Sequence, residues 1–313
     1  MLTRRRTLAL GAGFVLLPPT SLAARTQVTG VQRRSVGDLA ITALLDGYLE
    51  LHPDQVLSGI DADATAALLA RAFIEGDAVA TAVNAYVIET GGRTILVDGG
   101  AGAAFGPTAG HVLAALDAGG IAPDAIDTLV CTHQHPDHIG AFTTEDGAAR
   151  FADAELVVHE ADRAFWADEA NFAGADEMTR NFAAAAQAAL AAYGDRLRPV
   201  GDGTEIAPGV TARHLPGHTP GHTGLRLSSG DEDLLLWADL VHIGPVQFPR
   251  PGATIGFDVD PAQAEATRRA LFEEVAADRL MVAGSHVSFP SFGHLEARGA
   301  GYAFTPARWP YEL

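Results

Sequence analysis

The fold is decided by Thr132-His133-Gln134-His135-Pro136-Asp137-His138-Ile139-Gly140. An apolar run ends at Thr132, so the polar side chains that follow are expected in a loop at the C-terminal end of a strand. Three histidines and one aspartate supply the imidazoles and the carboxylate that Zn²⁺, Fe²⁺, Mn²⁺ and Co²⁺ accept as ligands. A histidine-rich surface loop without metal is the alternative, but so dense a cluster favours a metal site.

The spacing inside this stretch predicts two directions for the ligands. His133 and His135 are two residues apart, so in an extended segment their side chains point to the same side. Pro136 restricts the backbone of His135 to an extended conformation. Asp137 and His138 then turn toward a second position.

Three further candidate ligands follow predicted strands later in the chain. His218 lies in a Pro-Gly-His turn, Asp239 follows the apolar run 234–238, and His286 follows the run 280–283. Taken alone, each of these residues is as readily explained by a structural role as by metal binding. Together with the histidine-rich stretch, they supply the ligands that a two-metal site needs.

Apolar stretches of strand length recur at residues 39–45, 83–89, 94–97, 128–132, 155–158, 224–227, 234–238 and 280–283. Helical patterns cover 61–74, 108–118, 175–193 and 261–277, with Asp61 as an N-cap and Pro261 following Asp260. Hairpin-like pairs of strands, with helices interspersed, predict packed sheets with outer helices, an α+β fold. No linker divides residues 25–313, so we expect one domain there.

The composition narrows the function classes. Hydrophobic residues make up 48% and charged residues 19% of the chain, which is typical of a globular protein with a sizeable core. The net charge is −18 and the sequence contains no lysine, so the surface would repel a phosphate backbone and nucleic acid is excluded as a partner. The single cysteine, Cys131, lies in an apolar run and is expected to be a buried structural residue.

Residues 1–24 have the features of an export signal. Arg4, Arg5 and Arg6 precede an apolar run at 8–17, and Ser21 and Ala23 supply the small residues that signal peptidase requires. The paired arginines fit a twin-arginine signal. This apolar run is too short to cross a hydrocarbon core of about 30 Å. We therefore expect an exported protein, periplasmic or secreted, without a membrane span.

The histidine-rich stretch, the Pro-Gly-His218 turn, Asp239 and His286 resemble the metallo-β-lactamase superfamily. The resemblance implies a four-layer αββα sandwich with the active site at one edge, between the two sheets. It also implies a ligand set: His133, His135 and His218 for the first metal, Asp137, His138 and His286 for the second, and Asp239 bridging the two. Asp98 matches an aspartate that braces the histidine loop in this family, with an ordinary turn residue as the alternative.

Residues 237–242, 246–249 and 285–290 resemble methyl parathion hydrolase and its relatives within this superfamily. That branch implies aromatic pocket walls at Phe105, Trp166 and Phe182, with core packing as the alternative for each. His242 lies three residues after the bridging aspartate, where lactonases of the superfamily often carry tyrosine. The resemblance therefore implies either a hydrogen-bond donor to a developing oxyanion or a wall residue.

The resemblance implies a hydrolase with two divalent metal ions, zinc first, with iron, manganese or cobalt as alternatives. A water bridging the metals would attack an uncharged lactone, aryl ester or phosphotriester, while Asp137 orients it and transfers a proton. The alternatives are a glutathione-thioester hydrolase and a non-hydrolytic di-iron or metal-binding protein of the same fold. The segment 166–181 is a candidate cover for the pocket, and its mobility is left open by the sequence. The sequence allows a homodimer without requiring one.

Overall fold

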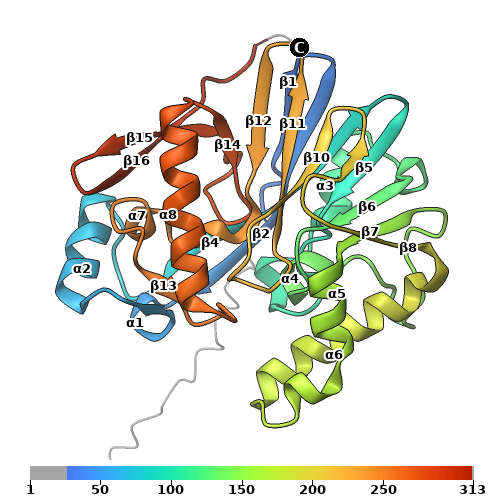
Figure 1. Cartoon of the computed structure of the whole chain (residues 1–313), viewed down its shortest axis with the longest axis horizontal. Helices are drawn as coiled ribbons and strands as arrows, with labels where there is room; N and C mark the ends of the chain where they lie inside the picture. Colours follow the sequence, from blue (N-terminus) through green and yellow to red (C-terminus); the bar gives the residue numbers. More distant parts are fainter. Residues whose placement is uncertain (1–26, 312–313) are drawn as a thin grey trace, which may run out of the picture.

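The computed structural model describes residues 27–311, so the predicted export signal lies outside the described residues. Two seven-stranded sheets form the centre of the molecule (Figure 1). The first sheet has the order β1 (Val31–Val36), β2 (Leu39–Leu51), β4 (Val79–Thr90), β5 (Arg93–Val97), β6 (Thr128–Cys131), β7 (Glu155–His159) and β8 (Leu197–Val200). The second has the order β16 (Gly301–Pro306), β15 (Gly293–Arg298), β14 (Met281–Ala283), β12 (Glu232–Leu236), β11 (Thr223–Ser229), β10 (Val210–His214) and β9 (Glu205–Ala207).

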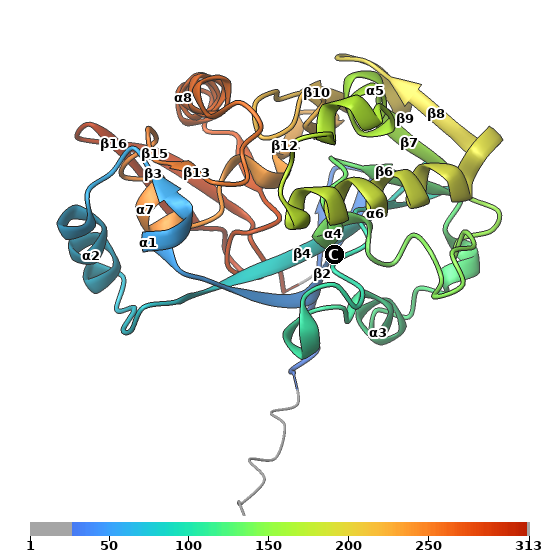
Figure 2. The same ribbon diagram turned by 90° about the horizontal axis from the view of Figure 1, so that it is seen from below.

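Helices cover the outer faces of both sheets. The longer ones are α2 (Ala62–Arg71), α3 (Val112–Ala118), α5 (Glu160–Ala167), α6 (Glu177–Tyr193) and α8 (Pro261–Ala277). Short connections contain α1 (Pro53–Val56), α4 (Pro136–Ile139), α7 (Gly244–Gln247) and the two-stranded pair of β3 (Leu57–Ser58) with β13 (Thr254–Ile255). Figure 2 shows α6 lying across the first sheet, and the long strands β2 and β4 extending toward α1 and α2. None of the helices within residues 27–311 is long and apolar enough to cross a membrane.

Successive side chains along each strand point to opposite faces of its sheet, and this alternation produces the layers. In β6, Val130 packs between the two sheets, whereas its neighbours Leu129 and Cys131 pack outward against α3 and α6. In β12, Leu234 and Leu236 face the first sheet, and Leu235 faces α8. Each sheet therefore has two apolar faces, one against the other sheet and one against helices. The predicted four-layer αββα sandwich is confirmed, and Cys131 is buried as expected.

The outer layer on the second sheet is built around Trp237. This side chain belongs to the apolar cluster that joins Leu235 of β12 to α8, and its ring centre lies 5.8 Å from that of Phe272. Gly284 passes so close to the indole that an added Cβ would lie 2.1 Å from its Nε1. This close packing fixes the position of Trp237, and with it the end of β12.

All eight predicted strands and all four predicted helices are present, with Asp61 and Asp260 as N-caps that accept hydrogen bonds from the backbone of Ala64 and Gln263. Several boundaries differ, by up to three residues at the other helices, and the largest difference among the helices is at α3, which begins at Val112 rather than at residue 108. Gly110 precedes it with φ +91°, a conformation that ends any helical run through residues 108–111. The elements that were not predicted are the strands β1, β3, β8, β9, β10, β13, β15 and β16 and the helices α1, α4, α5 and α7.

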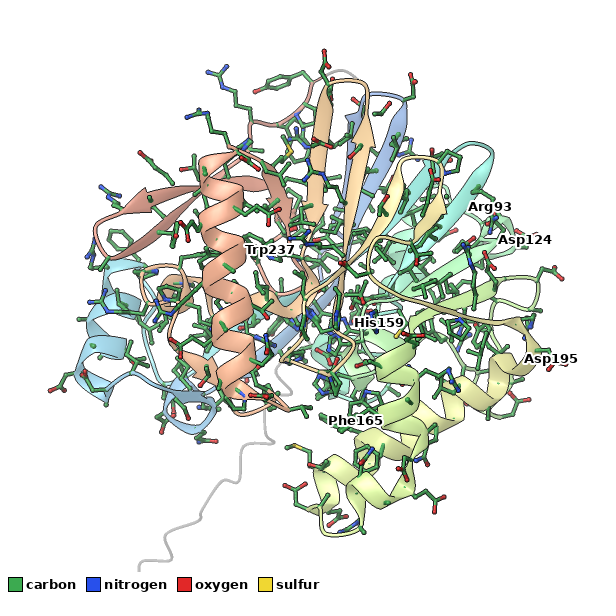
Figure 3. All side chains as sticks on the ribbon, viewed as in Figure 1. Arg93, Asp124, His159, Phe165, Asp195 and Trp237 are labelled. Carbon is green, nitrogen blue, oxygen red and sulfur yellow. The ribbon has the colours of Figure 1, made fainter. Side chains whose placement is uncertain are left out.

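The two ends of the first sheet have different roles. Strands β5, β6 and β7 are parallel, and at their N-terminal ends the Arg93 guanidinium binds the carboxylates of Asp127 (2.6 Å) and Glu155 (2.8 Å). Figure 3 shows Arg93 at the periphery of the molecule. The C-terminal ends of the same strands point to the opposite edge, where the histidine-rich stretch begins.

Candidate metal centre

Four strand ends bring the candidate ligands together. His133 and His135 follow β6, and Asp137 and His138 lie on the single turn of α4, which begins at Pro136. His218 follows β10 in the first turn of its connection to β11. Asp239 lies in a 3-10 turn directly after β12, and His286 follows β14. Because all of these strands end at the same edge of the sandwich, seven residues spread over half of the chain meet there.

The first group consists of three buried imidazoles. The Nδ1 atom of His135 lies 3.0 Å from the Nε2 of His133 and 3.0 Å from the Nε2 of His218. His135 has the extended backbone that the following proline requires, with φ −73° and ψ 151°. Burial lowers the pKa of His133 and of His135 well below the ordinary value, and neighbouring imidazoles lower it further. Three imidazoles thus converge, and the lowered pKa keeps His133 and His135 in the neutral state that binds a metal.

The second group pairs two carboxylates with two imidazoles. The Oδ2 of Asp137 lies 3.6 Å from the Nε2 of His138 and 3.4 Å from that of His286. Asp239 completes the group, with its Oδ1 3.3 Å from His138 Nε2 and its Oδ2 2.9 Å from His286 Nε2. All four side chains are buried.

Asp239 also faces the first group. Its Oδ2 lies 3.5 Å from the Nε2 of His218 and 3.7 Å from that of His133. One carboxylate is therefore within reach of both groups, which is the position predicted for a bridging ligand. The Oδ1 atom of Asp239 and the Nε2 of His138 are buried and have no hydrogen-bond partner among the described residues. Buried polar atoms without partners are costly, so this arrangement fits bound cations.

Hydrogen bonds on the outer side of the rings orient three of the imidazoles. The Nδ1 of His138 lies 2.8 Å from Asp98 Oδ2, and that of His286 lies 2.8 Å from the carbonyl oxygen of Ala82. The Nδ1 of His218 lies 2.9 Å from Asp258 Oδ1. Each Nδ1–H donates to an oxygen acceptor, which leaves the lone pair of Nε2 directed into the centre. The donor set and its orientation fit two divalent ions.

The pKa shifts in the second group also fit a bound cation. Burial alone would raise the pKa of Asp239, but the imidazoles of His138 and His286 hold it well below its usual range. Burial alone would lower the pKa of His286, yet the carboxylates of Asp239 and Asp137 raise it to about 10. The two carboxylates therefore favour positive charge in this buried site. A bound metal ion would supply that charge.

Asp98 holds the histidine loop from below. Its carboxylate accepts hydrogen bonds from the backbone N–H (2.9 Å) and the hydroxyl (2.9 Å) of Thr132, and it also contacts His138. Its own φ is +62°, in the left-handed region that residues other than glycine seldom adopt. The structure thus places Asp98 in the bracing position that the resemblance implied, rather than in an ordinary turn.

Two buried residues beside the centre were missed. Asp258, which orients His218, lies in an irregular segment after β13 and carries no recognisable sequence signal. His222 lies beneath Asp239, where its Nε2 accepts a hydrogen bond from the Asp239 backbone N–H at 3.0 Å and its Nδ1 donates to the Leu215 carbonyl at 2.8 Å. The second histidine of the turn 215–222 was the available signal, but its spacing from His218 suggested no role.

A pocket of about 410 Å³ opens onto the centre and reaches His135, Asp137, His218, Asp239 and His286. Phe105 and Phe182 line it as predicted, with ring centres 6.5 Å apart. Met178, Phe257 and the segment 49–56 complete the walls and were not predicted. Residues 166–181 lie beside the pocket through Met178, at the start of α6.

The prediction that Trp166 lines the pocket was wrong. Trp166 is buried in the core under the first sheet, where it stacks on Phe172 at 5.3 Å. Its ring lies 5.6 Å from that of His135, so it supports this ligand from behind instead of facing a substrate. Helix α5, which was not predicted, turns this residue inward.

His242 forms part of the wall between the ligands and the pocket. Its Nε2 lies 3.2 Å from Asp239 Oδ2, and its ring stacks on His286 at 5.0 Å. The backbone N–H groups of His242 and Ile243 both donate to Gln247 Oε1, which fixes this turn. Burial lowers the pKa of His242 to about 4, so its imidazole is neutral at physiological pH.

Comparisons with known proteins agree with this site. The model of the metallo-beta-lactamase superfamily matches residues 78–286. Hydrolase AbOPH of the beta lactamase superfamily is 32% identical, with 91% of this chain and 100% of that chain covered and a TM-score of 0.85. AidC, a dizinc quorum-quenching lactonase, is 24% identical, with 90% and 99% covered and a TM-score of 0.84.

A probable metal-dependent hydrolase from Staphylococcus aureus is 18% identical, with 90% and 100% covered and a TM-score of 0.73. No curated protein matches the chain significantly. The likeness to AidC and to the S. aureus protein shows a shared fold. The family model and the match to AbOPH also show that the chain is a member of the family. The chain therefore belongs to the metallo-beta-lactamase superfamily and is a metallohydrolase of that fold.

Proposed function

We propose that this protein hydrolyses uncharged ester-type substrates with two divalent metal ions, lactones first and aryl esters or phosphotriesters as the alternatives. The observation that carries the proposal is the convergence of two buried ligand groups on Asp239 beneath an apolar pocket. The likeness to AidC, a lactonase, supports lactones as the first class to test. Zinc is the first metal to test, since imidazole and carboxylate ligands suit it.

The residues of the first group would be His133, His135 and His218, and those of the second Asp137, His138 and His286, with Asp239 shared. When bound, the metals would supply Lewis acidity and an activated water. The Asp137 carboxylate lines the pocket beside His286, where it can orient a water and hold its proton. Its pKa lies well below its usual range because the imidazoles of His138 and His286 outweigh burial, so it is ionised and ready to accept one.

His242 is placed to act on the substrate oxygen. A neutral imidazole carries one N–H, and His242 lines the pocket with its Nε2 3.2 Å from Asp239 Oδ2. We propose that this N–H donates to the oxygen on which negative charge develops, the role for which a polar group at a fixed distance is most effective.

The walls favour uncharged, apolar substrates. Phe105, Phe182, Phe257 and Met178 surround the opening, and no arginine is among the pocket-lining residues that the structure describes. The one acidic side chain outside the ligand groups, Glu50, is exposed. An anionic glutathione thioester would find no counter-charge here, which disfavours that alternative.

The test is hydrolysis of matched lactone, aryl-ester and phosphotriester substrates by the metal-loaded protein. Asp239→Asn should abolish activity, whereas Asp124→Asn, an exposed aspartate far from the pocket (Figure 3), should leave it unchanged. Metal content is measured on each sample. Two metals per chain with no turnover of any class would contradict the proposal.

A further inference from the structure

His242 and His286 line a second cavity as well as the pocket described above. This cavity has a volume of about 900 Å³ and runs along β16, between β1, the end of α2 and the segment after α7. It is larger than the substrate pocket and is lined by different side chains apart from the two shared histidines. The proposed hydrolysis makes no use of it.

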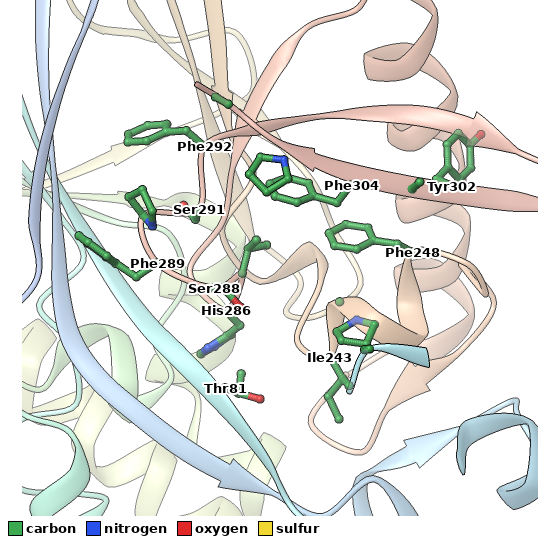
Figure 4. A pocket seen from close by; sticks show the side chains of 18 of the residues that line it. Thr81, Ile243, Phe248, His286, Ser288, Phe289, Ser291, Phe292, Tyr302 and Phe304 are labelled. Carbon is green, nitrogen blue, oxygen red and sulfur yellow. The ribbon is translucent and has the colours of Figure 1, made fainter. Parts of the chain in front are cut away.

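Aromatic side chains form the floor of the second cavity. Figure 4 shows Phe292, Phe304 and Phe248 in a row, with His286 below them. Phe248 and Phe304 stack in parallel, with ring centres 5.2 Å apart and planes 7° from parallel. Trp309 lies at the end toward the C-terminus and is 56% exposed. A flat or flexible apolar body would bury its surface against these rings.

The charge of this cavity is opposite to that of the chain. Its lining includes Arg34, Arg71, Arg250, Arg298 and Arg308. No aspartate or glutamate occurs among the lining residues within 27–311, although the whole chain carries a net charge of −18. Elsewhere in the described part, some arginines, such as Arg93, Arg213 and Arg226, are paired with carboxylates, and others, such as Arg150 and Arg163, are not. The five arginines of the cavity are not paired with any carboxylate of the described part.

Arg34 is the clearest example of a cavity arginine without a counter-ion among the described residues. Its side chain is partly buried, with its guanidinium 5.2 Å above the ring of Phe292 and one Nη2–H donated to the carbonyl oxygen of Arg308 at 2.7 Å. Its Nε is buried and has no hydrogen-bond partner among the described residues. A partly desolvated guanidinium without a counter-ion is unfavourable, and an anion bound beside it would remove that cost.

We propose that this arginine-lined cavity binds a small amphipathic anion, namely a carboxylate with an aromatic or alkyl body. The guanidinium groups would bind the carboxylate in a planar, two-pronged geometry, and the row of phenylalanines would cover the apolar body. A volume of about 900 Å³ lies within the range of sites that enclose a small organic molecule. Acid products of ester hydrolysis belong to this chemical class; that link rests on the proposed function, whereas the binding itself does not.

The experiment measures binding of 4-phenylbutyrate by calorimetry to the metal-loaded protein, with 4-phenylbutanamide as the uncharged control. We expect the carboxylate to bind about tenfold more tightly than the amide or better, and to weaken as salt is added. The double variant Arg34→Gln/Arg308→Gln should weaken carboxylate binding by about tenfold or more. Arg213→Gln/Arg226→Gln, which removes two paired surface arginines, is the matched control and should bind as the wild type does.

Three further measurements distinguish loss of the binding site from loss of folding. Arg250→Gln/Arg298→Gln changes two exposed side chains and should also weaken binding, so a folding defect at Arg34 would not obscure the outcome. The carboxylate should change the fluorescence of the wild type, and Trp309→Phe should lose that change while retaining affinity. Asp239→Asn should retain 4-phenylbutyrate binding, because none of the arginines and phenylalanines of the cavity is a candidate metal ligand.

The proposal is overturned if the amide binds as tightly as the carboxylate, or if the arginine variants match their control. Binding that disappears in Asp239→Asn but survives in the arginine variants would place the carboxylate at the metal centre. A dimer that dissociates in the arginine variants, seen by sedimentation, would make a second copy the occupant. Failure of hydrolysis would leave the binding result standing, so the two proposals fail separately.

Discussion

The neutral imidazole of His242 contacts Asp239 and lines the pocket, so its contribution to catalysis can be isolated. His242→Phe keeps a ring but removes the N–H, and we expect kcat to fall by roughly 10²-fold with little change in KM, because the donor acts on charge that develops only in the transition state. His242→Tyr restores a donor and should recover part of the loss. Equal activity of the Phe variant and the wild type would reduce His242 to a wall residue.

His222 supports Asp239 from beneath, and its titration should be visible in stability. Its pKa is lowered to about 3, first by burial and then by the neighbouring His218, whereas in the unfolded chain it is near 6.5. The unfolded state therefore binds more protons between these values, and the stability that the neutral ring contributes is lost as the pH falls from about 6.5 toward 3.

Urea unfolding of the metal-free protein and of His222→Gln, measured between pH 8 and 5, checks this expectation. The stability difference between the two should shrink toward pH 5, by up to about 1.4 kcal/mol for each pH unit below 6.5. His294→Gln, at a half-buried histidine away from Asp239, is measured in parallel as the comparison. A pH-independent difference would mean that His222 titrates alike in both states.

At the scale of single residues, the sequence predicted the ligands better than their surroundings. His133, His135 and His138 were recognisable because metal chemistry requires several donors within a short loop. Asp258 was not recognisable, since it reaches His218 only through the tertiary fold. Trp166 was misplaced because an aromatic residue near the site in sequence can face either the pocket or the core, and its unpredicted helix decides which.

Strand β2 contains a bulge that organises one pocket wall. Asp46 interrupts the pairing with β4 and accepts backbone hydrogen bonds from Ala101 (3.0 Å), Gly110 (2.8 Å) and Val112 (2.8 Å). This carboxylate thereby fixes the loop that carries Phe105 and the start of α3. A polar residue within the apolar run of β2 was the available sequence signal.

Asp46→Ala would leave three N–H groups without their acceptor. We expect the free energy of unfolding to fall by about 2–4 kcal/mol, as for other buried donors left unpaired. KM for an apolar substrate should rise because Phe105 loses its support. Denaturant unfolding and steady-state kinetics measure both effects, and Asp38→Ala, at an exposed turn, provides the comparison. An unaltered KM would show that the loop holds Phe105 without Asp46.

Elements with a strong apolar pattern were predicted and those without one were missed. The strands β5, β6 and β12 are buried on both faces, so their continuous apolar runs are evident in the sequence. Strands β1 and β16 lie at sheet edges and expose polar side chains, so their runs resemble loops. The same edges form the arginine-lined cavity, which sequence analysis therefore did not anticipate.

For the molecule as a whole, the metals should contribute to stability. Each ligand group combines residues from both sheets, since His133, His135 and His138 follow the first and His218 and His286 follow the second. Ions that bind only the folded state stabilise it by about 2.7 kcal/mol at a free concentration of 100 Kd. We expect chelation to lower the Tm by roughly 5–10 °C.

Thermal unfolding with and without a chelator tests this expectation, with zinc added back to show reversal. Asp239→Asn should respond less, because it has lost the ligand shared by the two groups. A Tm that is indifferent to the chelator, in protein shown to have lost its metal, would mean that the two sheets hold together without the ions.

The separation of ligands from pocket walls has a consequence for the history of this protein. Every candidate ligand follows the end of a central strand, whereas Phe105, Met178, Phe182 and Phe257 come from connections and helices that contribute no ligand. Descendants of such a chain can change the length and composition of these connections without disturbing the metal chemistry. Substrate range can therefore evolve separately from the metal chemistry, and a descendant can accept a new substrate while it keeps the same ligand set.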